Sequence, residues 1–477
     1  MINIEVNDMD NFSIRILKAE INNYKNVEYG KIDFTNKECD FTKANILGLY
    51  GQNGSGKTTL VNIFEILKTL LSGKALPNYI SDFIKEDNKN STFLFEFLLN
   101  KKHTQYKVIY QFKIAVKSET SNSLDSDNKK PKLFIESEKL QFKKIDDKDT
   151  VRYKDIINYE FNRKDFLLPK SRLDEIVGKN REIMDELRAS RFISYKQATS
   201  FIFSENTLEI LEKSVSKDVS EYFDIIKILK RFSDLYLFII TNKSTGLINA
   251  NFVLPFSFRL ESEDSLAVGS IGIKLEGTSI IPEVAFKTIN KVIDQMNIVL
   301  KTIIPNLQIK LKNLGKETMK NGNTGISVEL MSIKNNLIIP LQYESDGIKK
   351  IISILHMLIC LFNNPSLTLV IDEFDSGIFE YLLGEILKII EDSGRGQLIF
   401  TSHNLRPLET LNKNNIMFTT SNPLNRYIRL KNIGANNNLR NIYFHDIVLG
   451  GQNECIYEPT NSFNIAMAFR MAGDTNE

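Results

Sequence analysis

The sequence contains no tryptophan and only three cysteines, and each shortage narrows the classes of protein that it can encode. Cys39, Cys360 and Cys455 lie far apart and form no C-x-x-C pair, which argues against a zinc ribbon and a disulfide framework. Such sparse cysteine favours the reducing cytoplasm. No apolar run approaches the roughly 18 residues that a membrane helix needs. The first residues also lack the apolar core of a secretory signal.

The chain has no surplus of either charge, because 61 Lys and Arg face 59 Asp and Glu, a net charge of 61 − 59 = +2. This balance argues against a strongly basic protein that coats DNA. The local run 129–132 (KKPK) with Lys143 and Lys144 is interpreted as solvated loop charge. With 42% hydrophobic and 25% charged residues, the composition is that of a globular protein. At about 150 residues per domain, the length suggests about three domains or one large interrupted domain.

Hydrophobic periodicity predicts a β-rich N-terminal part interrupted by one helix. Two short runs within 13–35, broken at Asn22-Asn23 and Gly30, predict a hairpin or a pair of strands, and the apolar run 45–50 predicts a buried strand. Spacings of three and four residues then predict a helix. The later segments predicted here are the helix 57–72, the alternating β segments 92–116 and 133–144, and a polar, mobile loop over 117–132.

The remainder of the chain predicts a helical region followed by mixed elements. No heptad pattern runs far enough to predict a long coiled-coil arm. The helix over 346–363 is apolar nearly all round, which predicts deep burial. Short apolar runs at 367–371 and 397–401, with a helix between them, predict parallel strands. The other predicted elements are helices over 165–231, a strand at 235–240, β structure over 251–275, an amphipathic helix at 283–303 and a hairpin over 307–341.

The strongest motif is GQNGSGKT, which runs from Gly51 to Thr58 and matches G-x-x-x-x-G-K-[ST]. Its glycines let backbone N–H groups turn inward around phosphates, and the helix that begins there adds its positive end. Lys57 would reach the β- and γ-phosphates, and the Thr58 hydroxyl would bind Mg²⁺. The predicted strand before the motif and the helix after it strengthen the assignment.

A second motif, LTLVIDE, ends an apolar strand in Asp372 and Glu373. That position is the carboxyl end of a strand, where open α/β sheets bind ligands. Asp372 is predicted to hold the Mg²⁺ shell, and Glu373 to activate the attacking water as general base. An apolar strand that ends in acids is common by itself. The pattern indicates a nucleotide site only because a phosphate-binding loop accompanies it.

Two weaker motifs support this site. His403 follows the apolar strand QLIFT, where it would contact the γ-phosphate; by itself it would be interpreted as a helix cap. The segment ESDG over 344–347 opens the apolar helix. Ser345 is first a helix cap there, although the free N–H groups and Gly347 also suit an anion.

Together these motifs resemble the ABC-type ATPases of the RecF/SMC/Rad50 group, and most of all the stand-alone ATPases of bacterial anti-phage defence systems such as PARIS and Septu. The resemblance covers roughly residues 13–72 and 341–430. It implies an α/β fold, a P-loop NTPase head of ABC type with a mixed β-sheet core, an antiparallel β subdomain and a helical insertion. The implied division is 1–164 and 311–430 for the two halves of the head, 165–310 for the insertion and 431–477 for a tail.

The resemblance also implies roles for individual residues, with ATP and Mg²⁺ as cofactors. Ser345 and Gly347 resemble the signature motif, which acts on ATP bound to the other subunit, and Asp375 resembles the D-loop acid. His403 resembles the switch histidine. Two ATP molecules would thus be held between the heads of a homodimer. Lys25 is a weaker candidate near the nucleotide, and the residues predicted to bind ATP are Gly51, Asn53, Gly54, Ser55, Gly56, Lys57, Thr58 and Thr59.

Some positions depart from the family pattern. The signature differs from the LSGGQ of transporters, which argues against a transporter ATPase. Ile378-Phe379-Glu380 replaces a Leu-His-Pro that relatives often carry after the D-loop. Gln111 and Gln141 are alternatives for the Q-loop glutamine. Only 74 residues follow His403 (477 − 403), too few for an added nuclease domain. The tail 437–469 predicts one more strand, a turn and a closing helix, with a docking surface as the alternative to a purely structural role.

Three functions remain open on the sequence. The first is a cytoplasmic defence ATPase that holds a separate effector, such as a nuclease or toxin. No membrane is expected among its partners. The second is a RecF- or Rad50-like ATPase that clamps duplex DNA in repair or maintenance, which needs several Lys and Arg contacts to phosphate. The third is a structural protein in which bound nucleotide only orders the dimer. The near-neutral charge favours the first.

Overall fold

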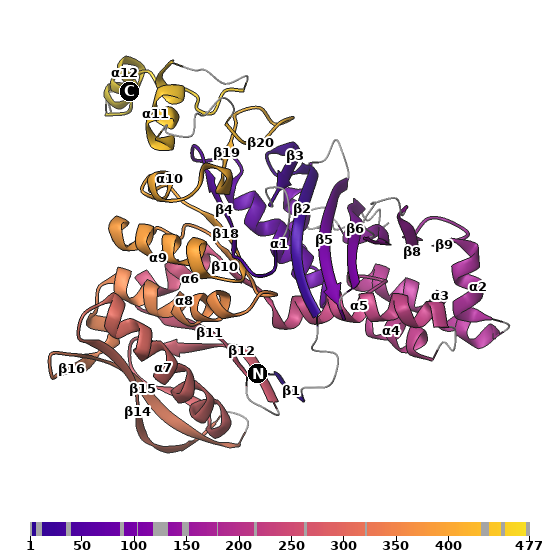
Figure 1. The fold of residues 1–477 in the computed structure, drawn as a ribbon, viewed down its shortest axis with the longest axis horizontal. Helices are drawn as coiled ribbons and strands as arrows, with labels where there is room; N and C mark the ends of the chain where they lie inside the picture. The colour runs from indigo at the N-terminus through magenta and orange to yellow at the C-terminus, as the bar shows by residue number, and fades with distance from the viewer. Residues whose placement is uncertain are drawn as a thin grey trace, which may run out of the picture.

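The computed structural model describes residues 2–5, 12–34, 40–85, 90–102, 104–117, 132–145, 152–178, 180–213, 217–261, 265–319, 322–430, 438–449 and 454–473. Four β-sheets organise this chain, with three, six, four and seven strands. The six-stranded sheet lies in the middle, between the seven-stranded sheet and a layer of helices (Figure 1). The predicted α/β class with mixed and antiparallel sheets is confirmed. The predicted loop over 117–132 lies almost entirely outside the described residues.

The central sheet has the order β10-β17-β18-β4-β19-β20, and only β20 runs antiparallel to its neighbour. Strands buried on both faces are continuous apolar runs, which explains NILGLY and LTLVI. The predicted parallel strands are confirmed, and β4, β18 and β17 place their carboxyl ends side by side. The strands are β4 (Asn45–Tyr50), β10 (Leu237–Ile240), β17 (Thr368–Ile371), β18 (Gln397–Thr401), β19 (Ile416–Thr419) and β20 (Tyr427–Ile428).

Helices cover both faces of this sheet: α1 on one side, α8 and α9 on the other (Figure 1). The predicted burial of the apolar helix is confirmed, since Ile352 and Met357 of α8 are fully buried. Ile298 of α7, by contrast, is exposed. The bounds are α1 (Lys57–Leu71), α7 (Glu283–Ile303), α8 (Asp346–Asn363), α9 (Glu380–Ser393) and α10 (Pro407–Thr410).

The seven-stranded antiparallel sheet has the order β3-β2-β5-β6-β7-β8-β9 and packs on α1 through aromatic pairs such as Phe64 and Phe95. The predicted hairpin is confirmed, but its turn is Lys25-Asn26 rather than Asn22-Asn23. The strands are β2 (Phe12–Tyr24), β3 (Val27–Asp33), β5 (Asn90–Lys101), β6 (Thr104–Lys117), β7 (Lys132–Lys144), β8 (Lys154–Glu160) and β9 (Leu167–Leu168).

Residues 170–340 form further helices and, except for β1 near the N-terminus, both small sheets. These helices are α2 (Lys170–Val177), α3 (Arg181–Gln197), α4 (Glu205–Glu212), α5 (Lys217–Leu235) and α6 (Asn242–Asn249). One small sheet joins β1 (Ile2–Glu5) to β12 (Ser265–Lys274) and β11 (Val253–Glu261). The other holds β13 (Ser279–Pro282), β14 (Leu307–Thr318), β15 (Thr324–Lys334) and β16 (Leu337–Pro340).

The strand predicted in the tail is wrong, because a helix is found there. Residues Leu439–Leu449 form the helix α11, and α12 (Ser462–Gly473) follows as the predicted closing helix. Tyr443 of α11 is buried against Phe418, with ring centroids 4.9 Å apart. Phe418 belongs to β19 and lies 25 positions before Tyr443 (443 − 418). No local sequence pattern therefore indicated this contact. Among the described helices, none combines the length and apolar character required to cross a bilayer.

Candidate functional site

The phosphate-binding loop is a strand-to-helix connection between β4 and α1. Gly54 and Gly56 have φ angles of 78° and 100°, in the left-handed region that favours glycine. At Gly51 a Cβ atom would lie 1.7 Å from the Thr419 hydroxyl oxygen, so only glycine fits beside β19. The glycine pattern of the motif therefore follows both from the turn and from a neighbouring strand.

Residues at and next to β20, the last strand of the central sheet, hold this loop and the neighbouring hairpin turn through hydrogen bonds. The Tyr427 hydroxyl donates to the Gly56 carbonyl at 2.9 Å. The buried Arg426 guanidinium donates to the Asn26 carbonyl at 2.6 Å and to the Thr420 carbonyl at 2.6 Å. These residues lie about 370 positions beyond the loop in sequence (427 − 56 = 371). Sequence reasoning missed them, since no local pattern marks them.

Lys57 lies inside the loop with its ammonium group turned toward backbone oxygens. Its Nζ donates to the Gly51 and Gln52 carbonyls at 2.7 and 2.9 Å. Burial lowers the pKa of Lys57, and the carboxylates of Asp372 and Glu373 oppose that shift. An anion that replaces the two carbonyls would gain a charge-assisted hydrogen bond from a donor already in place.

The two acids follow β17, and Thr401 at the end of β18 holds both. The Thr401 hydroxyl donates to Asp372 Oδ1 at 2.6 Å, and the Glu373 backbone N–H donates to the same hydroxyl at 2.8 Å. Glu373 adopts a positive φ of 48°, uncommon for a residue with a side chain. Burial raises the pKa of Asp372, while the hydrogen bond from Thr401 opposes the rise. Thr401 is a site residue that the sequence did not predict.

The donor atoms fit Mg²⁺ held jointly by protein and substrate. Asp372 Oδ2 is buried and has no hydrogen-bond partner within the described chain, so it is open to a cation. Thr58 lies beside it on the same pocket. No cluster of three or more His, Cys, Asp or Glu that could hold a metal occurs in the described residues. One carboxylate and one hydroxyl match the way Mg²⁺ is bound through few protein ligands plus phosphates.

These groups line one pocket of about 490 Å³. The structure thus brings together most of the predicted residues, and it adds Asn26, whose side chain accepts from the Thr59 hydroxyl at 3.1 Å. Lys25 also lines the pocket, and its Nζ lies 4.0 Å from the ring centroid of Phe83. The lining residues are Lys25, Asn26, Asn53, Gly54, Gly56, Lys57, Thr58, Thr59, Asp372, Glu373, Thr401 and His403.

Asp375 positions the segment that carries His403. Its Oδ2 accepts from the His403 and Asn404 backbone N–H groups at 3.1 and 2.9 Å. The His403 side chain is exposed at the pocket rim. Within one chain, Asp375 therefore acts on the histidine loop, and its predicted contact with a second subunit stays a prediction.

Other predicted residues do not line the pocket. Ser345 is exposed and caps α8 by accepting from the Ile348 N–H at 3.4 Å. At Gly347 a Cβ atom would lie 2.0 Å from the Gly377 carbonyl, so close packing requires this glycine. Neither alternative for the Q-loop glutamine is among the residues that line the pocket. Gln111 lies on β6, and Gln141 on β7 donates to Asp155 at 2.6 Å.

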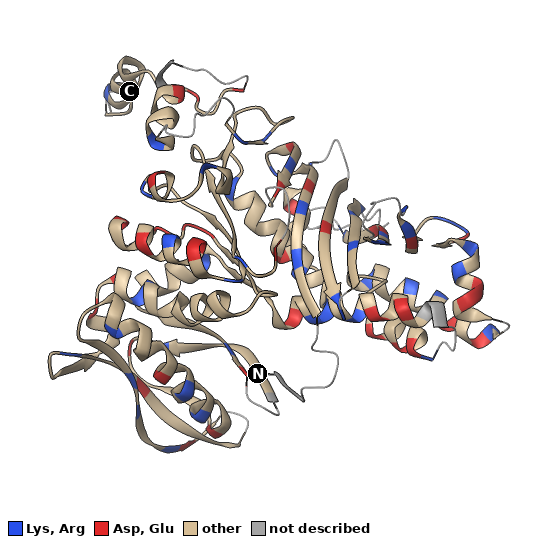
Figure 2. Cartoon of the chain, viewed as in Figure 1, with Lys and Arg blue, Asp and Glu red and all other residues tan. Residues whose placement is uncertain are grey.

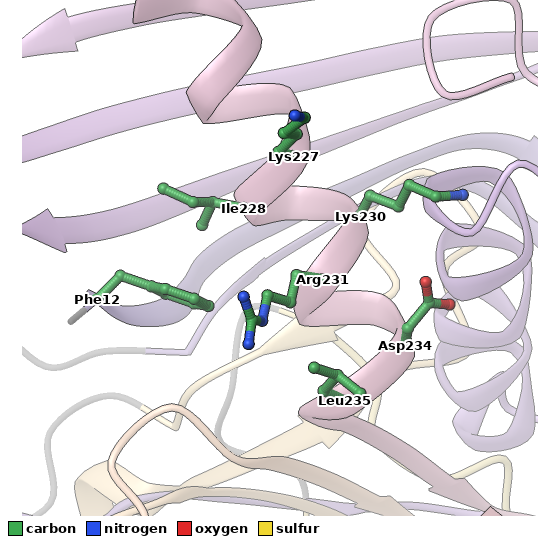
Figure 3. Close-up of a pocket in the computed structure, with 7 residues that line it drawn as sticks. All are labelled: Phe12, Lys227, Ile228, Lys230, Arg231, Asp234 and Leu235. Carbon is green, nitrogen blue, oxygen red and sulfur yellow. The ribbon is translucent and has the colours of Figure 1, made fainter. Parts of the chain in front are cut away.

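A separate hollow lies along α5 and is a weaker candidate (Figure 3). Two of its basic side chains are engaged elsewhere: Lys230 donates to the Ser72 carbonyl at 3.0 Å, and Lys227 to Glu212 at 2.8 Å. The rest of the lining includes the apolar Phe12, Ile228 and Leu235. Cations already paired within the fold give a ligand little to bind, so we assign no function to this hollow.

The loop, the buried lysine and the two carboxylates at the end of β17 define a P-loop ATPase domain. Residues 46–408 match the sequence model of the family described as "AAA domain, putative AbiEii toxin, Type IV TA system", and the chain belongs to this family. No curated protein matches the sequence.

Solved structures of SMC heads are similar at 12% identity. A head bound to the C-winged helix domain of ScpA has a TM-score of 0.36 and covers 87% of this chain and 98% of its own. A Pyrococcus furiosus head with an extended coiled coil, bound to the C-terminal domain of ScpA, also scores 0.36, with coverages of 87% and 96%. A Thermotoga maritima head scores 0.35, with coverages of 88% and 100%.

Proposed function

We propose that this protein hydrolyses ATP at a site shared by two copies of the chain, and that the nucleotide state regulates a separate effector in anti-phage defence. The observation that carries hydrolysis is the arrangement around Thr401, which presents Asp372 and Glu373 to the same pocket as Lys57. Each group has a distinct task in phosphoryl transfer. The defence role draws further support from the family description, which names a toxin of a toxin–antitoxin system.

The proposed chemistry uses five residues of one chain. Lys57 leaves its two backbone carbonyls to bind the β- and γ-phosphates. Thr58 and Asp372 would hold Mg²⁺, which would neutralise part of the phosphate charge when bound. Glu373 accepts a proton from the attacking water, and His403 at the pocket rim stabilises the γ-phosphate. The strained backbone of Glu373 fixes the direction of its side chain.

The proposed second copy completes the site. Ser345 is exposed at the start of α8, where backbone N–H groups are available to an anion, yet it does not line the pocket of its own chain. Asn53, Gly54 and Thr58 are exposed on the open side of the phosphate-binding loop. A second copy that presents Ser345 and Gly347 to this open side would enclose the nucleotide.

The regulator is proposed to be a protein rather than DNA. Figure 2 shows Lys and Arg interspersed with Asp and Glu along the ribbon, without a single-signed stripe in this view. Several candidate cations are paired: Lys144 with Glu221 at 2.7 Å, and Lys101 with Asp224 at 2.6 Å. A duplex-binding face needs several cations free to contact phosphate.

The test compares wild-type protein with Glu373→Gln, because the amide keeps the shape of the base and removes its basicity. Wild-type protein is expected to turn over ATP slowly, and Glu373→Gln to retain ATP through gel filtration with Mg²⁺, near one nucleotide per chain. Glu380→Gln, an exposed acid at the start of α9, is the matched control and should behave as wild type. Unchanged turnover in Glu373→Gln would remove that residue as the base.

Duplex DNA is added to the same assay at two salt concentrations. A rate indifferent to DNA supports regulation by a protein partner. A rise of at least about tenfold that high salt abolishes would overturn the proposal in favour of a DNA-clamping ATPase, since contacts to phosphate weaken steeply with salt.

A further inference from the structure

Helix α12 is apolar on all sides, yet all of its residues are exposed in the part of the chain that the structure describes. Phe463, Phe469 and Met471 are 69%, 77% and 72% exposed. The only charged residue in the helix is Arg470. A helix that is hydrophobic all round is normally buried. Its surface is therefore expected to be covered in the assembled protein.

One face of α12 has the pattern of a helix that docks into a groove. Ile465, Ala468, Phe469 and Ala472 recur at the i, i+3, i+4 and i+7 spacing that places side chains on one stripe. The two large residues would act as anchors, and the two alanines allow close approach. Arg470 directly follows Phe469, about 100° further round the helix, so it lies at the edge of this stripe.

The same chain carries an apolar groove that no described residue fills. The groove, here called the α7–α9 groove, lies between α7, α8 and α9 and has a volume of about 520 Å³. Ile298 and Ile389 on its walls are 73% and 55% exposed. Glu385 is the only charged residue that lines it. Its apolar lining includes Ile303, Leu358, Phe362 and Ile386.

We propose that α12 of one copy docks into the α7–α9 groove of a second copy, with Arg470 facing Glu385. The apolar stripe matches an almost wholly apolar lining, and the single cation of the helix matches the single anion of the groove. Neither surface is covered by the described part of the chain itself. The two exposed faces are therefore complementary in both character and charge.

The path of the tail argues against docking within one chain. The Glu458 backbone N–H donates to the Gln52 side chain at 3.0 Å, which fixes the tail at the phosphate-binding loop. Only residues 459–461 then connect to α12, a link that spans at most about 14 Å even when extended. Figure 1 shows α11 and α10 between α12 and α9. This short link holds α12 away from its own groove.

Reciprocal exchange of α12 would close two copies into a symmetric pair. The α7–α9 groove lies along the C-terminal half of α8, whereas Ser345 caps the opposite end of that helix. The two contacts therefore use different surfaces. Docking of α12 requires no nucleotide, and a protein that makes both contacts would form an assembly larger than a dimer.

The first test is sedimentation equilibrium of the full chain without nucleotide and with EDTA, so that ATP-dependent closure cannot contribute. Phe469→Asp and Ile389→Asp change the two sides of the contact at exposed positions. Each is expected to raise the dissociation constant at least about tenfold, because burying an aspartate replaces burying a large apolar side chain. Leu337→Asp, at a residue that is 62% exposed on β16, is the matched control and should leave association unchanged.

The second test identifies the occupant of the groove. In a background of Cys39→Ser, Cys360→Ala and Cys455→Ser that associates as wild type, a Phe469→Cys chain is mixed with an Ile389→Cys chain. A disulfide between the two different chains is expected. A monomeric wild-type protein would overturn the proposal. So would a concentration-independent disulfide within a single chain that carries both cysteines, which would place α12 in its own groove.

Discussion

At the residue scale, the best-determined feature of the site is the buried ammonium group of Lys57. It donates to two backbone carbonyls that phosphate oxygens would replace. Lys57→Ala should therefore weaken ATP binding at least about 100-fold, since two hydrogen bonds to a charged group are lost. Titration of a fluorescent ATP analogue measures the dissociation constant. Lys74→Ala, an exposed lysine just beyond α1, is the control, and equal affinity in the two variants would contradict the assignment.

Thr401 is expected to matter for turnover more than for nucleotide binding. Its hydroxyl donates to Asp372 and accepts from the Glu373 backbone, so Thr401→Val removes both contacts without changing the size of the side chain. We expect a fall in turnover of at least about tenfold. The required Mg²⁺ concentration should rise as well, because that hydrogen bond opposes the upward pKa shift of Asp372. A Mg²⁺ titration of the steady-state rate measures both effects, and an unchanged profile would contradict this role.

Residues that act through local sequence could be predicted, and those that act across the sheet could not. Lys57, Asp372 and His403 each belong to a motif next to an apolar strand, and all three line the pocket. Tyr427 contacts the loop from 371 positions away and Arg426 contacts Asn26 from 400 positions away, so their roles depend on strand order. Asn26 became part of the pocket only because the hairpin turn lies at Lys25-Asn26.

At the element scale, α8 connects the segment that holds Ser345 and Gly347 to the strand β17, which precedes Asp372 and Glu373. Gly347 at its start touches the Gly377 carbonyl just beyond those acids. One turn further on, the buried Lys350 donates to the Thr245 hydroxyl at 2.6 Å. Burial lowers the pKa of Lys350, and the carboxylates of Glu373 and Asp372 oppose that shift. A movement of α8 would therefore alter both the capped end and the charges near the pocket.

The contact between α8 and β11 is expected to make the free energy of unfolding depend on pH. His356 Nε2 lies 3.2 Å from the Arg259 carbonyl oxygen and 3.3 Å from the Arg259 backbone nitrogen, and Cys360 Sγ lies 3.4 Å from the same ring nitrogen. Burial lowers the pKa of His356 to about 4, while an unfolded chain keeps the ordinary value of 6.5. Between these values the unfolded chain binds the additional proton. The free energy of unfolding should thus decrease as the pH falls from about 6.5 to about 4, by roughly 3 kcal/mol in total.

Urea unfolding of wild-type protein and His356→Gln at pH 7, 6, 5 and 4 measures this effect. The amide can still form a hydrogen bond with the Arg259 backbone but does not titrate. The difference between the two proteins isolates His356 from the acids that titrate in the same range. We expect the wild type to lose stability relative to the variant below pH 6.5. Parallel curves would show that His356 is as easily protonated in the folded protein as in the unfolded chain.

Elements with a strong period were predicted with nearly correct bounds, and elements defined by distant contacts were not. The helix expected over 346–363 is α8, because a helix that is apolar nearly all round tolerates few alternatives. The prediction of a strand in the tail was wrong for the opposite reason. The segment that forms α11 has little periodic pattern, and the burial of Tyr443 against Phe418 gives it its place.

At the scale of the whole molecule, the proposed shared site predicts complementation between two inactive variants. Lys57→Ala removes the phosphate contact of its own chain, and Ser345→Arg blocks the surface that this chain would present to its partner. Each variant should be inactive alone. A mixed dimer holds one site with both defects and one site with none, because the intact Lys57 and the intact Ser345 come from different chains.

Turnover in a one-to-one mixture measures this directly. About a quarter of the wild-type rate is expected, since random pairing makes about half of the dimers mixed and each mixed dimer has one intact site of two. Glu380→Gln mixed with Lys57→Ala serves as a reference for pairing, because the first variant retains a complete site. A mixture that stays as inactive as its components, although the proteins exchange subunits, would place Ser345 outside the site. The chain would then hydrolyse ATP within a single copy.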